Sequence, residues 1–99
     1  MAVIVELRTE SGEVLAAGGG DGALERLASA ARESSPCLRW IDPYGDTVFN
    51  STQSAALAAE LREAAKELSG AARAAVERLI EMAQACADGV HVYLWCIGD

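Results

Sequence analysis

The stretch that decides the fold spans residues 37–50 and reads CLRWIDPYGDTVFN. Together with the closing run HVYLWC, residues 91–96, it contains all five Phe, Trp and Tyr residues of the chain. The sequence between the two runs is built largely from Ala, Leu, Glu and Arg, which favour helices. Aromatic and β-branched residues favour strands, so both runs are predicted as strands of one sheet. We expect any function to lie on or beside these strands.

Within the first run, residues 37–41 and 46–49 are predicted as two strands of a hairpin. The four residues between them begin with Asp42 and Pro43 and end with Gly45. Asp at the first position, Pro at the second and Gly at the fourth are typical of a β-turn. Residues 42–45 are therefore predicted to form the reversal of this hairpin.

Towards the N-terminus, residues 3–7 and 14–17 flank a Ser-Gly reversal and predict another hairpin. A glycine-rich run follows, GGGDG at residues 18–22. Such a run can cradle phosphate, but its spacing matches neither the dinucleotide-binding nor the P-loop pattern. We interpret it as a linker in which Asp21 is the N-cap of a helix over residues 22–32.

Towards the C-terminus, the apolar periodicity predicts a helix that begins at residues 50–52 and another that begins at Ser69. The two helices form a helical hairpin with a very short link, or else one long bent helix. Gly89 is predicted as a left-handed C-cap of the second helix. The last strand, residues 90–97, is apolar on both faces, which favours a central position in the sheet.

The predicted fold class is α+β, in the order ββαββααβ. We expect a mixed or antiparallel five-stranded sheet with the helices packed on one face. The chain has 99 residues, a length that fits one domain spanning residues 1–99.

Charge and cysteine content limit the partners and the compartment. Eight basic residues are scattered among fifteen acidic ones, the net charge is −7 and the isoelectric point is about 4.6. Nucleic acids and anionic membranes require clustered Lys and Arg, so neither is expected as a partner, whereas a basic protein is compatible. No leader segment or membrane-spanning run is visible. Three cysteines, an odd number without paired spacing, favour a reducing compartment and thus a cytoplasmic location.

In a regular strand the single histidine of the chain shares a face with two aromatic side chains of the closing run. If the helices cover the other face, this row is either a partner surface or a second packed layer. Tyr44 at the turn is a further candidate contact, with polar neighbours as a rim. The predicted partner-binding residues are Trp40, Asp42, Tyr44, Asp46, His91, Tyr93 and Trp95.

The favoured function is a small acidic protein-interaction module, such as an inhibitor, an immunity-like protein or an adaptor. No enzyme activity, cofactor or metal is expected, because no catalytic set and no paired Cys spacing is present. The alternative is a small enzyme or ligand-binding domain centred on His91, with Asp42 and Asp46 or with Cys37. A further expectation is a homodimer, in which a symmetric contact buries the aromatic row together with Ile4.

The segments IDPYGDTVFN, residues 41–50, and YLWCIGD, residues 93–99, resemble those of a group of small uncharacterised proteins from high-GC bacteria. The resemblance covers most of the chain, and these two motifs are its specific part. It implies a cytosolic bacterial protein and carries no catalytic or binding residues.

Overall fold

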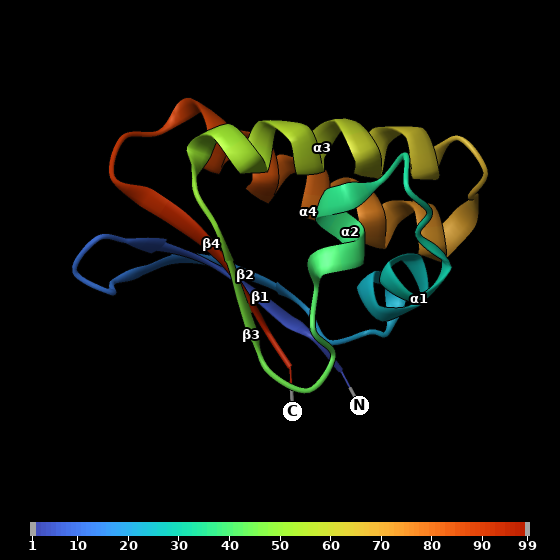
Figure 1. The fold of residues 1–99 in the computed structure, drawn as a ribbon, viewed down its shortest axis with the longest axis horizontal. Helices are drawn as coiled ribbons and strands as arrows, with labels where there is room; N and C mark the ends of the chain where they lie inside the picture. The colour runs from blue at the N-terminus through green and yellow to red at the C-terminus, as the bar shows by residue number, and fades with distance from the viewer. Residues whose placement is uncertain (1, 99) are drawn as a thin grey trace.

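The computed structural model describes residues 2–98, and its fold is α+β (Figure 1). Over this range the elements follow one another as β1 (Ile4–Thr9), β2 (Val14–Gly19), α1 (Ala23–Ala30), α2 (Pro36–Trp40), β3 (Asp46–Phe49), α3 (Ser51–Ala65), α4 (Gly70–Asp88) and β4 (Val92–Ile97). Figure 1 shows the helices gathered on one side of the sheet. The sheet therefore has one face covered by helices and one face that is open.

The strands form one antiparallel sheet in the order β2-β1-β4-β3. The predicted N-terminal hairpin is confirmed by the pairing of β1 with β2. The central position predicted for the last strand is also confirmed, because β4 lies between β1 and β3. The closing run therefore lies in the middle of the sheet.

The predicted five-stranded sheet is wrong: residues 2–98 contain four strands. Residues 37–41 do not form a strand, since residues 36–40 form the short helix α2. Pro36 stands in its first turn, where a missing N–H costs nothing. The carboxylate of Glu60 on α3 accepts the N–H groups of Cys37 at 3.1 Å and of Leu38 at 3.0 Å. This contact spans more than twenty residues, so local strand propensity could not predict it.

Without that strand, the second predicted hairpin is absent, but its turn still forms. The backbone N–H of Gly45 donates to the carbonyl oxygen of Asp42 at 3.4 Å. The Asp42 carboxylate accepts the N–H of Tyr44 at 2.8 Å. The turn thus has the predicted chemistry but connects α2 to β3.

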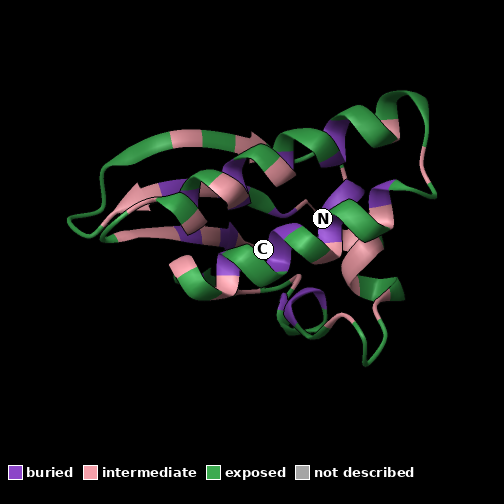
Figure 2. Cartoon of the chain, turned by 90° about the horizontal axis from the view of Figure 1, so that it is seen from above, coloured by how far each residue is buried: buried purple, intermediate pink, exposed green. Residues whose placement is uncertain are grey.

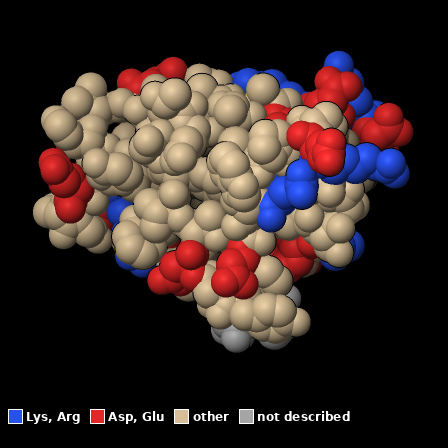
Figure 3. Space-filling model, in the orientation of Figure 1, with Lys and Arg blue, Asp and Glu red and all other residues tan. Residues whose placement is uncertain are grey.

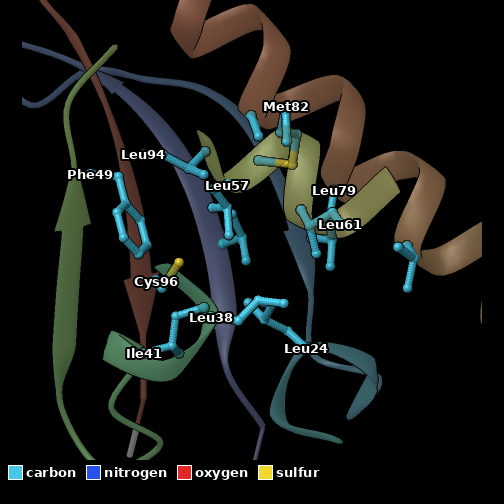
Figure 4. Packing of buried hydrophobic residues seen from close by; sticks show 14 of the residues in the cluster. Leu24, Leu38, Ile41, Phe49, Leu57, Leu61, Leu79, Met82, Leu94 and Cys96 are labelled. Atoms are coloured by element: carbon cyan, nitrogen blue, oxygen red, sulfur yellow. The ribbon is translucent and has the colours of Figure 1, made fainter. Parts of the chain in front are cut away.

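The core lies between the helices and the covered face of the sheet (Figures 2 and 4). Figure 4 shows Phe49, Leu94 and Cys96 of the sheet directed towards leucines of α3 and α4. At the side of the sheet, a Cβ on Gly18 would lie only 3.1 Å from the sulfur of Met82. Glycine on β2 therefore allows α4 to pack closely on the sheet.

The helical hairpin α3–α4 forms as predicted, with a short link over residues 66–69. Asn50 caps α3: its carboxamide accepts the N–H of Gln53 at 2.8 Å, while the Gln53 side chain accepts the N–H of Asn50 at 2.9 Å. The predicted left-handed cap at Gly89 is wrong, because its φ is −92°. A Cβ there would lie 2.5 Å from the Val92 side chain, so close packing explains the glycine.

Helix α1 begins slightly later than predicted. Its N-cap residue is Gly22, with φ of 84°, a left-handed conformation that glycine adopts without strain. Asp21 nevertheless helps to begin the helix, because its carboxylate accepts the N–H of Ala23 at 3.1 Å.

Candidate functional site

The candidate site is the face of the sheet that the helices leave uncovered. Side chains alternate between the two faces of a strand, and directly paired residues share a face. The buried Val5, Leu94 and Phe49 define the covered face. The side chains of the open face belong to Ile4, Glu6, Arg8, Val14, Ala17, Asp46, Val48, Tyr93, Trp95 and Ile97, while Gly19, which pairs with Ile4, contributes no side chain there.

The strand register arranges these residues in rows across the sheet. In the middle row, Trp95 lies between Glu6 on β1 and Val48 on β3. In a neighbouring row, Ile97 lies between Ile4 and Asp46. Trp95 is therefore close to the centre of the open face, and Asp46 lies at its β3 edge.

The two charges nearest the centre of the open face are bound to each other. Arg8 donates from Nε and Nη2 to Oε1 of Glu6, at 2.8 and 2.6 Å. Its guanidinium also lies over the Trp95 ring, 4.3 Å from the centroid, a cation–π geometry. These side chains consequently present a nearly neutral, partly aromatic surface.

The composition of the open face is unusual for an antiparallel sheet. A solvated sheet face is ordinarily polar, but here seven of the ten open-face residues are apolar. Ile4 is 46% exposed, and Tyr93 and Trp95 are half-buried by their neighbours. This apolar character is typical of a surface that another molecule covers.

A second exposed aromatic group adjoins the open face at the turn. We call Trp40, Asp42, Tyr44 and Asp46 the turn surface; Trp40 is 61% and Tyr44 69% exposed. The N–H of Gly98 donates to the carbonyl oxygen of Gly45 at 2.8 Å, which ties the turn to the end of β4. Asp46 belongs to both surfaces. The structure therefore brings six of the seven predicted residues to two adjoining surfaces.

His91, the seventh predicted residue, lies apart from them. It precedes β4, and its φ of 55° is left-handed, so the strand alternation that would place it beside Tyr93 does not apply. Asp46 pairs with Ile97 at the other end of β4, about 20 Å away at roughly 3.3 Å per residue. The structure does not group His91 with Asp42 or Asp46.

The carboxylate nearest to His91 belongs to Glu10. Its Oε2 is 3.6 Å from Nδ1 of His91, and both side chains are largely exposed. They line a hollow of about 520 Å³ that is open to solvent. A separation of 3.6 Å is too long for a hydrogen bond, so this pair does not form an oriented acid–base couple.

The cysteines are buried and poorly suited to nucleophilic chemistry. The Cys37 pKa is raised to about 11, chiefly by burial and then by Glu60. Burial raises the pKa of Cys96 to about 12 and also raises that of Cys86. Because the thiolate is the nucleophile, these groups stay protonated near neutral pH. In the described range no three His, Cys, Asp or Glu residues are grouped as metal ligands.

Several open-face residues were not among the predicted site residues, namely Glu6, Arg8, Val14, Ala17, Val48 and Ile97. Alternation within residues 3–7 is the signal that separates Glu6 from the buried set. Placing Val48 beside Trp95 requires the strand order and register, which a single sequence does not contain.

No protein-family model, curated protein or solved structure matches the chain. The resemblance to small proteins of high-GC bacteria stays a prediction, and the last residue of its second motif, Asp99, lies outside the described residues. Among residues 2–98, no helix has the length and apolar character needed to cross a membrane.

Proposed function

We propose that this chain is a small acidic protein-interaction module, acting as an inhibitor, immunity-like protein or adaptor. In this proposal the open face and the adjoining turn surface bind a protein partner. The observation that carries it is the apolar open face, whose two central charges are already paired with each other. The free energy falls when another apolar surface removes such a surface from water.

The size of the open face supports this role. Three strands of six residues and one of four, at about 3.3 Å per residue and about 4.8 Å between strands, give a face of roughly 350 Å² in projection. The largest apolar patch on a typical monomer is about 300–600 Å² and is often functional. With the exposed Trp40 and Tyr44, the module offers aromatic anchors of the kind that dominate binding energy.

The charge distribution favours a protein as the partner. The scattered basic residues give no support to nucleic-acid binding. Asp46 and Asp42 place carboxylates at the rim, where a basic partner would find opposite charge. A second copy of this chain also fits the apolar centre. A cytoplasmic location is part of the proposal and is supported by the three free, buried thiols.

The test is capture of partners from the native cell extract with the wild type and with Trp95→Ala and Tyr44→Ala. Val90→Ala is the matched control, because Val90 is apolar and 78% exposed but lies outside both surfaces. We expect Trp95→Ala to lose a protein that the control retains, and Tyr44→Ala to bind it more weakly. Circular dichroism verifies that each variant is folded. Recovery of identical proteins by all four forms would contradict the proposed surface.

A further inference from the structure

We propose that the open face is covered by the open face of a second copy of this chain. The two sheets would stack about 10 Å apart, with the helices of both copies on the outside. In this proposal the partner of the open face is a second copy of the chain, and the proposal rests on the proposed function. It is supported by the charge on the face, its area and the condition of the sheet edges.

The net charge of the chain is −7, so two copies repel each other. On the open face, one Arg against the two carboxylates of Glu6 and Asp46 leaves a formal charge of only −1. Figure 3 shows many charged side chains gathered at the end where α1 and the α3–α4 link lie. Stacking through the open faces therefore brings the copies together at a surface of low formal charge. For a basic partner the open face offers only the carboxylate of Asp46, because that of Glu6 is bound to Arg8.

The area of the open face determines the affinity that we expect for the dimer. A stable interface covers about 800 Å² on each partner, whereas the open face measures roughly 350 Å² in projection. Interdigitating side chains such as Ile4 and Val48, both more than two-fifths exposed, enlarge the area that is buried. The expected dimer is weak and forms with increasing concentration, with a dissociation constant of about 1–100 µM.

The sheet edges are poorly suited to association by strand pairing. The β1–β2 ladder shifts register after Leu7, and Gly19 near the other end of β2 has φ of +79°. Bulges and bends of this kind are known protections of an edge strand. The other edge, β3, is only four residues long. An antiparallel pairing of edges would therefore be short, which favours the open face as the contact.

The test is sedimentation equilibrium over a concentration series, with Ile4→Glu and the control Val90→Glu. Each substitution adds the same charge at an exposed apolar position, but only Ile4 lies on the open face. Because a symmetric contact carries the change twice, we expect Ile4→Glu to weaken the dimer by about 100-fold. Val90→Glu should change it less than about threefold. A wild type that stays monomeric up to about 100 µM, or an Ile4→Glu variant that dimerises normally, would overturn the inference.

A dilution series of the unmodified protein gives a second measurement that does not depend on a variant folding. The chain has two tryptophans, so NMR shows one indole N–H signal from Trp95 and one from Trp40. We expect the Trp95 signal to move with concentration while the Trp40 signal stays fixed. Movement of Trp40 alone would overturn the inference. A monomeric protein that still captures another protein through Trp95 would also overturn the inference, but it would support the proposed function.

Discussion

Removal of the Glu60 side chain should test the contact that makes residues 36–40 helical. The Glu60 carboxylate reaches from α3 to the first turn of α2 and accepts two backbone N–H groups, from Cys37 and Leu38. Both of these residues are buried, so water replaces the lost acceptor poorly. The carboxylate also stands at the positive end of the short helix. Glu60→Ala leaves both donors unsatisfied.

The magnitude follows from these two bonds. A hydrogen bond to a charged group contributes about 1.5–3 kcal/mol, and partial rehydration at this half-buried site reduces the sum. We expect Glu60→Ala to lower the free energy of unfolding by about 2 kcal/mol, within the typical stability of a domain of this size. That corresponds to a fall in Tm of roughly 8–16 °C. Glu60→Gln keeps an acceptor oxygen but loses the charge. Its free energy of unfolding should lie between those of the wild type and Glu60→Ala.

Urea unfolding followed by circular dichroism measures the loss, and the NMR signal of the Trp40 indole N–H reports on the end of α2. The matched control is Glu63→Ala on the same helix, whose carboxylate contacts only the exposed Lys66 in the described structure, at 3.0 Å. Such a surface pair contributes little, so the control should stay within about 0.5 kcal/mol of the wild type. Equal losses in Glu60→Ala and Glu63→Ala would refute the capping role of Glu60.

Three further substitutions test other parts of the fold. Asn50→Ala should lower the free energy of unfolding by about 1 kcal/mol in a urea titration, since it removes the cap of α3; Thr52→Ala, at an exposed position two residues further along the chain, should stay within about 0.5 kcal/mol. Gly98→Ala would place a Cβ 2.5 Å from the Pro43 carbonyl, so we expect a lower Tm and shifted turn resonances, and an unchanged Tm would contradict this packing. Burial raises the Cys96 pKa to about 12 from 9.0, so the unfolded state ionises first as pH rises. The contribution of Cys96 to stability should then fall between pH 9 and 12, by up to about 1.4 kcal/mol per pH unit; a Cys96→Ala variant with an equally steep fall would show that Cys96 is not responsible.

The elements that the sequence predicted well are those whose signals are local. The alternation in residues 3–7 and the Ser-Gly reversal were sufficient for the first hairpin. The apolar periodicity and the capping residues at 50–52 were sufficient to predict the two helices of the helical hairpin. The central place of β4 followed from apolar residues at nearly every position. In each case the information lies within a few residues of the structure that it specifies.

The errors arose where distant contacts overrode local preference. The segment CLRWI has strand propensity, yet Glu60 supplies acceptors for a helical first turn. A left-handed backbone at His91 removes it from the strand that its neighbours form, and Glu10 is the carboxylate beside it. For the candidate site, alternation grouped Tyr93 with Trp95. Adding Arg8 and Val48 required knowing which strands pair.

The two apolar faces of β4 show how fold and function are related in this chain. A central strand needs apolar residues on a face only where another layer covers it. Helices α3 and α4 cover the face with Leu94 and Cys96, both of them buried. The face with Tyr93 and Trp95 has no covering helix in the described structure (Figure 1), and Arg8 shields only part of it. Folding of one copy therefore buries the apolar residues on one face of β4, and association would bury those on the other face.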